Sequence, residues 1–279
     1  MSDVRAEVHY VRNPPPAGAE PLTFVTEDEA RSTMVVTPGE EVVLHDLRGT
    51  TTSLDVEGFE LVRHASAVTD FHAIEEDAAV DALYLQEMEA FVAELTGADR
   101  IVMLGPGKKR YGEGATDRLA GLANAKPARY VHGDVTDVSG PDLAEGMVRG
   151  TAGIDLADFS RWAMYNVWRA ITPPPQDFPL AVCDARTIGR DDEIAVTAIT
   201  ALRGFGELAF PTAGYLPNPA HRWCWFRDMT PDEVLVFKTH DTDPSRAHRV
   251  AHTAFTNPAC PPDVPTRASV EIRALALFR

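Results

Sequence analysis

The stretch Trp162-Ala-Met-Tyr-Asn-Val-Trp-Arg169 is typical of a β-strand, because aromatic and apolar residues fill it. A proline-rich turn, Thr172-Pro-Pro-Pro-Gln176, separates it from a second such stretch, Phe178-Pro-Leu-Ala-Val-Cys-Asp-Ala-Arg186. Further short strands are expected downstream, at residues 194–199, 206–210, 221–227, 233–238, 249–255 and 269–278. Many short strands separated by Pro, Gly, Asn and Asp predict a β-sandwich, jelly roll or barrel.

Residues 75–95 show a different pattern, because their apolar side chains recur at helical spacing. Thr96-Gly97 would end this helix, since glycine is common directly after the last helical residue. We therefore predict a mainly β fold with helices, in one domain spanning residues 1–279. Residues 1–125 would form a helix-bearing α+β region, and residues 126–279 a double-stranded β-helix (jelly-roll, cupin-like) core.

A strand is expected at residues 100–104, followed by a glycine-rich loop at residues 105–114 near the mouth of the active site. This loop is not expected to bind a nucleotide. A phosphate-binding P-loop needs Ser or Thr directly after its lysine, whereas Lys109-Arg110-Tyr111 follows Lys108 here.

The composition narrows the range of partners and locations. The chain of 279 residues has 26 Lys and Arg against 42 Asp and Glu, a net charge of −16, which disfavours nucleic acids and anionic membranes. Three widely spaced cysteines, Cys183, Cys224 and Cys260, do not suggest a disulfide framework. With no apolar run long enough for a membrane span, we expect a cytoplasmic protein that binds a small molecule, as a monomer or a homodimer.

His132-Gly-Asp134 is the first candidate for catalytic chemistry. On a strand, side chains two residues apart share a face, so the imidazole and the carboxylate would point the same way. They would supply two of the three ligands of the 2-His-1-carboxylate site of non-heme Fe(II) oxygenases. Such a tripeptide is by itself more often a surface turn, so the hypothesis needs a third ligand.

Three late histidines compete for that role. His240 follows a strand in a polar segment, and His248 lies in the arginine-rich stretch 245–249. His252 belongs to Val250-Ala-His-Thr-Ala-Phe255, whose apolar residues favour a buried strand. We therefore place His252 first and His248 second.

Arg267-Ala-Ser269 lies fifteen residues after His252 and opens the last predicted strand. Arg267 and Ser269 share a strand face, and a guanidinium can bind a carboxylate with two hydrogen bonds. Many iron dioxygenases hold the distal carboxylate of 2-oxoglutarate with such a pair. The same residues are equally compatible with Arg267 as a solvated strand start, and Arg273 is a rival anchor.

Together these residues resemble a family of Fe(II)/2-oxoglutarate-dependent hydroxylases and desaturases. That family includes AsaB-like fungal enzymes, gibberellin desaturases and the cephamycin 7α-hydroxylating component. The similarity extends from about residue 45 to the C-terminus, through residues 54–61, 84–89, 95–100, 131–134, 166–169, 179–186, 218–223, 232–238, 252–255 and 267–274. The chain departs from the family pattern at residues 104–110 and at Cys224, which bears on the substrate pocket.

The resemblance implies that His132, Asp134 and His252 bind Fe(II), and that 2-oxoglutarate and O2 are cosubstrates. The expected activity is hydroxylation or desaturation of an unactivated C–H bond of a small molecule in secondary metabolism. Two alternatives stay open: a jelly-roll metal oxygenase that does not use 2-oxoglutarate, and a non-catalytic member that binds a small molecule or a partner.

Four residues are candidates for substrate binding. Asn166 and Trp168 share one face of their strand, and Arg169 points to the other, so only one set can face the pocket. Arg169 would otherwise pair structurally with Asp184. Arg222 is the fourth candidate, and it too would either bind the substrate or form a structural ion pair.

Overall fold

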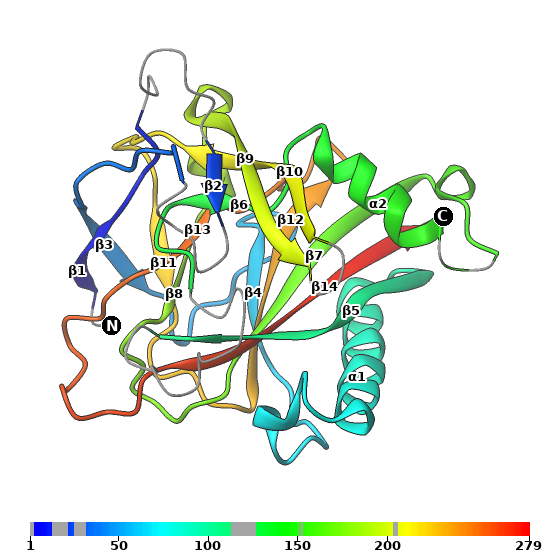
Figure 1. Cartoon of the computed structure of the whole chain (residues 1–279), viewed down its shortest axis with the longest axis horizontal. Helices are drawn as coiled ribbons and strands as arrows, with labels where there is room; N and C mark the ends of the chain where they lie inside the picture. The colour runs from blue at the N-terminus through cyan, green and yellow to red at the C-terminus, as the bar shows by residue number, and fades with distance from the viewer. Residues whose placement is uncertain are drawn as a thin grey trace.

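The computed structural model describes residues 3–12, 22–24, 32–112, 127–149, 151, 153–202 and 206–279, and these form two facing β-sheets (Figure 1). One sheet has five strands among these residues, in the order β4 (Phe59–Arg63), β12 (Glu233–Asp241), β7 (Arg161–Ala170), β14 (Ala268–Phe278) and β5 (Arg100–Tyr111). All its neighbouring strands are antiparallel.

The second sheet contains nine strands among the described residues, in the order β1 (Val4–Val8), β3 (Glu40–Asp46), β11 (Trp223–Trp225), β8 (Leu180–Cys183), β13 (His252–Ala254), β6 (His132–Gly133), β10 (Gly206–Tyr215), β9 (Glu193–Leu202) and β2 (Leu22–Phe24). Phe59, Trp168 and Phe237 of the five-stranded sheet pack in one cluster with Val182 and Cys224 of the nine-stranded sheet. The core therefore lies between the sheets, and the predicted mainly β jelly-roll fold is confirmed.

Helix α1 (Ala78–Thr96) covers the outer face of the five-stranded sheet, beside β5 (Figure 1). Asp77 caps its start by accepting a hydrogen bond from the Ala79 N–H at 2.8 Å. Gly97 ends it in the left-handed conformation, with φ of 67°, as expected for a C-cap. The predicted helix is confirmed, and it begins three residues later than expected because Asp77 supplies the cap.

The prediction of a glycine-rich loop is wrong for residues 105–111, because β5 extends from Arg100 to Tyr111. Its partner β14 supplies the pairing, from Ala268 to Leu277 with an irregularity between Glu271 and Arg273. Glycine permits close approach here, since a Cβ on Gly107 would lie 2.7 Å from Cγ1 of Val270. Residues 113 and 114 lie outside the described residues.

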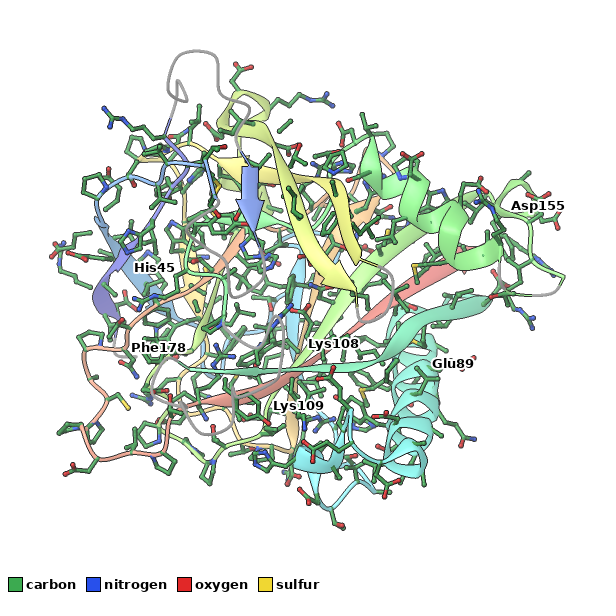
Figure 2. The ribbon with its side chains drawn as sticks, viewed as in Figure 1. His45, Glu89, Lys108, Lys109, Asp155 and Phe178 are labelled. Atoms are coloured by element: carbon green, nitrogen blue, oxygen red, sulfur yellow. The ribbon has the colours of Figure 1, made fainter. Side chains whose placement is uncertain are left out.

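Two lysines of this strand are tied to the segment that precedes α1. Lys108 and Lys109 lie on β5 (Figure 2), where the Lys108 ammonium bonds Glu75 at 2.9 Å. The buried Lys109 ammonium donates to the His72 carbonyl at 2.6 Å and to Glu76 at 2.5 Å. These lysines support the helix and do not form a phosphate cradle.

Both parts of the chain on either side of residue 125 contribute to both sheets. From the first part, β1 and β3 enter the nine-stranded sheet, and β4 and β5 enter the five-stranded sheet. The division at residue 125 and the count of one domain stay predictions. Within the described residues, no helix is both long enough and apolar enough to span a membrane.

Helix α2 (Ser139–Arg149) closes one end of the space between the sheets. Its Ala144, Met147 and Val148 pack against Met164 of β7 and Leu275 of β14. In Figure 1 the helix lies beside the ends of these two strands. It begins five residues after Asp134, so its packing holds the chain in place on the C-terminal side of the His132-Gly-Asp134 segment.

A buried ionic cluster holds β7 to β12. The Lys238 ammonium lies 2.5 Å from Asp241 and 2.8 Å from Asp55, and the side chains of Lys238 and Asp241 are fully buried. Arg161 of β7 binds both oxygens of Asp241, at 2.9 and 2.6 Å. Asp241 and Asp55 thus share the task of balancing the charges of Lys238 and Arg161, and Asp241 is the buried member of the two.

Replacing Asp241 with alanine is expected to lower the free energy of unfolding by about 3–5 kcal/mol, because Lys238 and Arg161 then keep only the partly exposed Asp55 as a counter-charge. Glu41→Ala is the control, since the Arg5–Glu41 pair is exposed and worth less than about 1 kcal/mol. Urea unfolding measures both variants. Equal losses in the two would contradict this account of the buried cluster.

Candidate metal centre

His132 and His252 face each other across two neighbouring strands. They are direct register partners in the antiparallel pair of β6 and β13, and their ring centroids are 4.2 Å apart. Directly opposed residues in such a pair project from the same face. The Phe237 ring, from the opposite sheet, lies 4.7 Å from that of His252, so both imidazoles point between the sheets.

Each imidazole is oriented by a backbone carbonyl two residues earlier. His132 Nδ1 lies 2.9 Å from the Tyr130 oxygen, and His252 Nδ1 lies 3.2 Å from the Val250 oxygen. A carbonyl only accepts, so each Nδ1 carries the proton and each Nε2 keeps its lone pair. Burial also lowers the pKa of His132 to about 4 and lowers that of His252, so both rings are neutral at pH 7.

Asp134 completes the group. Its Oδ1 lies 4.0 Å from His132 Nε2 and 3.0 Å from Nη2 of Arg273. Asn166 of β7 donates to its Oδ2 at 2.5 Å. Burial alone would raise the pKa of Asp134, but Arg273, the two histidines and Asn166 together hold it well below its usual range.

The donor set fits a divalent transition metal. One ligand atom from each of His132, Asp134 and His252 lies within 4.8 Å of the other two. Two neutral imidazole nitrogens and one ionised carboxylate make up the ligand set of the facial iron sites. The hydrogen bonds to both Nδ1 atoms are the outer support that such ligands normally have.

Arg267 is buried beside Ser269, with 2% of its surface exposed. Its Nη1 donates to the Ser269 hydroxyl, its Nε donates to the Phe178 carbonyl at 2.8 Å, and its guanidinium stacks over Trp168. Among the described residues, no carboxylate lies within ion-pair distance of it, and burial lowers the pKa of Arg267 to about 10. A buried cation without a counter-charge is unfavourable, which suits a site for an anionic ligand.

Comparisons with known proteins agree with this geometry. A family model described as an oxidoreductase/YMDC permease-like domain matches residues 8–277. The Fe(II)/2-oxoglutarate-dependent dioxygenase nvfI of Aspergillus novofumigatus is 31% identical over 239 residues, which cover 84% of this chain and 82% of that protein. The chain belongs to this family of Fe(II)/2-oxoglutarate-dependent oxygenases. The resemblance found in the sequence is thereby confirmed, and Fe(II), 2-oxoglutarate and O2 are its cofactor and cosubstrates.

Two further comparisons extend over nearly the whole chain. Hydroxylase/desaturase efuI of Hormonema carpetanum is 28% identical over 99% of this chain and 95% of that protein. The solved structure of the iron and alpha-ketoglutarate-dependent endoperoxidase NvfI superposes with a TM-score of 0.85 and 27% identity, over 99% of this chain and 98% of that one. Family membership thus favours the 2-oxoglutarate-dependent reading over both alternatives raised by the sequence.

The structure separates the four substrate-site candidates of this oxygenase. Asn166 and Trp168 face the space between the sheets, where Asn166 bonds Asp134 and Trp168 lies under Arg267. Arg169 faces the other way, against α1, with hydrogen bonds to His64 at 3.1 and 3.0 Å. Strand alternation therefore removes Arg169 from the pocket.

The proposed structural pair of Arg169 with Asp184 is also wrong. Asp184 instead binds Arg186 at 2.6 Å and Arg222 at 3.4 Å. Arg222 additionally contacts the Cys224 thiol at 3.3 Å. Its described contacts are thus structural ones within the nine-stranded sheet, and none of them is with a residue of the metal group.

His240 and His248, the other candidates for the third ligand, form a separate group with Asp137. His248 Nε2 lies 2.8 Å from Asp137, and Arg249 bonds both Asp137 and that same nitrogen. Neither histidine joins His132. Of the three late histidines, the structure therefore brings His252 to the H-x-D segment.

Glu271 also lies beside this group, although the sequence does not indicate a role for it, and Arg273 is expected from the sequence only as a rival anchor. Arg273 contacts Asp134 at 3.0 Å and Glu271 at 3.7 Å. Both lie on β14 at even spacing from Arg267 and Ser269. This alternation is the sequence signal that places Glu271 on the same strand face as Arg267 and Ser269.

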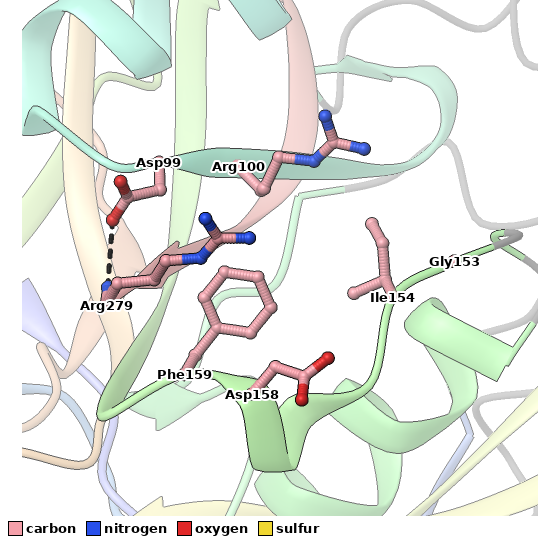
Figure 3. A pocket seen from close by; sticks show the side chains of 7 residues that line it. All are labelled: Asp99, Arg100, Gly153, Ile154, Asp158, Phe159 and Arg279. Atoms are coloured by element: carbon pink, nitrogen blue, oxygen red, sulfur yellow. Dashed lines mark hydrogen bonds between the residues drawn. The ribbon is translucent and has the colours of Figure 1, made fainter.

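A separate surface pocket of about 420 Å³ lies near the C-terminus (Figure 3). Its lining comprises Asp99, Arg100, Gly153, Ile154, Asp158, Phe159 and Arg279, and so includes no residue of the metal group. The Asp99 carboxylate accepts a hydrogen bond from the Arg279 N–H at 2.8 Å. We assign this pocket no part in the chemistry.

Stability of the metal-free protein is expected to fall as the pH drops from about 6.5 to 4, partly through His240. Burial and then the nearby His248 and Arg249 lower the pKa of His240 to about 4, so the unfolded chain binds this proton more readily than the folded one. His240→Asn should reduce the loss in the free energy of unfolding between pH 6.5 and 4 by about 3 kcal/mol. Urea unfolding at several pH values measures it, and an unchanged slope would contradict the assignment.

Proposed function

We propose that His132, Asp134 and His252 bind Fe(II) on one face and leave the remaining positions for 2-oxoglutarate and O2. One observation carries this proposal: two imidazole Nε2 atoms and a carboxylate converge, and both Nδ1 atoms are already engaged with carbonyls. A group with only a structural role would not need neutral, oriented lone pairs beside an ionised acid.

Arg267 and Ser269 would bind the distal carboxylate of 2-oxoglutarate. The support is electrostatic, because Arg267 is buried without a carboxylate partner among the described residues, whereas Arg273 already pairs with Asp134. An incoming dianion would supply the missing counter-charge to Arg267, and Ser269 would add a hydrogen bond. Arg267 is therefore a better anchor than Arg273.

Iron with these cosubstrates supplies an oxidant strong enough to remove hydrogen from an unactivated C–H bond. The chain's own residues orient the reaction and limit the access of water. Asn166 holds the Asp134 carboxylate, Trp168 packs against the anchor arginine, and Phe237 covers His252. The product is then a hydroxylated or desaturated small molecule.

Asn166 and Trp168 are the candidates that remain for contact with the substrate. We propose a small molecule of secondary metabolism as the substrate, because the named relatives include hydroxylase/desaturases such as efuI. We also propose a cytoplasmic location, with no nucleic-acid or membrane partner, and either a monomeric or a homodimeric enzyme. The acidic composition supports these proposals.

Alanine at His132, Asp134 or His252 is expected to abolish high-affinity Fe(II) binding, because each removes one of three protein ligands. His248→Ala is the matched control, since this histidine lies four residues before His252 and outside the group. Anaerobic Fe(II) titration followed by calorimetry measures the affinity. Retained binding in all three variants, or its loss only in His248→Ala, would refute the site.

Arg267→Ala should weaken 2-oxoglutarate binding about a hundredfold, with Fe(II) binding retained, because it removes two charged hydrogen bonds to the carboxylate. The charge-transfer absorption of the anaerobic Fe(II)–2-oxoglutarate complex reports the affinity. The exposed Arg5→Ala is the control and should not change it. Normal affinity in Arg267→Ala, together with a loss in Arg273→Ala, would make Arg273 the anchor.

A further inference from the structure

Four polar residues alternate from the position just before β14 into that strand and project from its inner face: Arg267, Ser269, Glu271 and Arg273. The first two form the proposed cosubstrate anchor. The last two lie beside Asp134, where Arg273 is 3.0 Å from the Asp134 carboxylate and 3.7 Å from that of Glu271. Arg273 thus stands between two acids, of which one is the proposed metal ligand.

The contacts of Glu271 do not give it a structural role apart from its pairing with Arg273. Its side chain is 16% exposed, and Arg273 is the one ion-pair partner recorded for it within the described residues. Burial and the neighbouring Asp134 raise the pKa of Glu271, whereas the nearby Arg273 and Arg110 favour its charged form. Arg110, the register partner of Ser269 on β5, brings a further cation to the same side of Glu271.

A cation beside a metal ligand disfavours metal binding, and the negative charge of Glu271 can offset this effect. Arg273 holds Asp134 in place. However, its positive charge offsets the negative charge of the carboxylate and repels an incoming metal ion. With Glu271 ionised beside Arg273, the group of Asp134, Arg273 and Glu271 keeps one net negative charge. Asn166 holds the other oxygen of Asp134, so Arg273 can move toward Glu271 without freeing the ligand.

We propose that Glu271 and Arg273 are positioning residues for the metal centre, in which Glu271 offsets the charge of Arg273. Arg273 pairs with Asp134 in the structure, and Glu271 would accept Arg273 when a divalent cation takes the Asp134 oxygen. This inference rests on the proposed metal site. It assigns no contact with substrate or cosubstrate to either residue.

Mn(II) binding to the metal-free protein, without 2-oxoglutarate, tests the charge argument. Glu271→Gln should weaken binding about tenfold or more, because the group becomes neutral while the side chain keeps its shape. Arg273→Gln should bind at least as tightly as the wild type, because one repulsive charge is gone. The double variant E271Q/R273Q should return to within about threefold of the wild type, since its net charge is restored.

Several outcomes would overturn the inference. Wild-type affinity in Glu271→Gln would do so, as would a double variant that binds as weakly as Glu271→Gln. An unaltered Mn(II) affinity with a raised substrate KM would instead place Glu271 in substrate recognition.

Three controls separate these outcomes from other causes. Glu89→Gln, on the solvent side of α1 (Figure 2), should leave the Mn(II) affinity unchanged. Urea unfolding of each metal-free variant shows that it is folded. If His132→Ala binds Mn(II) as the wild type does, the metal site itself is wrong, and the failure is not that of the Glu271–Arg273 pair.

Discussion

The direct pairing of His132 with His252 is the contact on which the site depends. Strand β6 has only two residues, and a slip of one residue would turn its imidazole to the outer face of the sheet. Neighbouring contacts fix the register: Thr212 donates to the Gly133 carbonyl at 2.5 Å, and the Val131 N–H donates to the His9 carbonyl at 2.7 Å. A Cβ on Gly133 would lie 3.2 Å from the Tyr215 hydroxyl, so the small residue between the two ligands suits this close packing.

The two sheets make different contributions to the site. The nine-stranded sheet carries both histidines, and the five-stranded sheet carries the side chains that act on the third ligand and on the cosubstrate. The register of β7 with β14 pairs Asn166 with Arg273, which brings both donors to Asp134 from adjacent strands. The chemistry therefore requires the strand registers within the sheets and the packing between them at the same time.

Local sequence patterns were sufficient for the parts of the site that lie within one strand. His132 with Asp134, and Arg267 with Ser269, are pairs two residues apart, so strand geometry alone predicts a shared face. His252 was favoured by its apolar neighbours, and the family resemblance agreed. The same reasoning could not orient β7, because nearly every residue of this strand is buried on both faces and polarity does not distinguish them. Sequence alone therefore does not decide which of Asn166 and Arg169 faces the site.

The continuation of strand β5 beyond residue 104 escapes sequence reasoning for a related reason. Its glycines predict a loop, and the partner that makes it a strand, β14, is at the other end of the sequence. Glu271 shows the same limitation. An acid at that position gains meaning only when Arg273 and Asp134, which come from different strands or segments, are known to lie beside it.

Two groups in this chain have the same residue types, and their electrostatic surroundings distinguish them. In the group of Asp137, His240 and His248, the Arg249 guanidinium already binds the carboxylate and the His248 Nε2, and Glu193 secures Arg249 at 2.7 Å. A divalent ion there would meet a fixed cation at two of its three ligands. In the group of His132, Asp134 and His252, Arg273 contacts only the carboxylate, and Glu271 lies next to it as an alternative partner. The composition of a ligand set therefore identifies candidates, and the charges around it decide which of them can receive a metal ion.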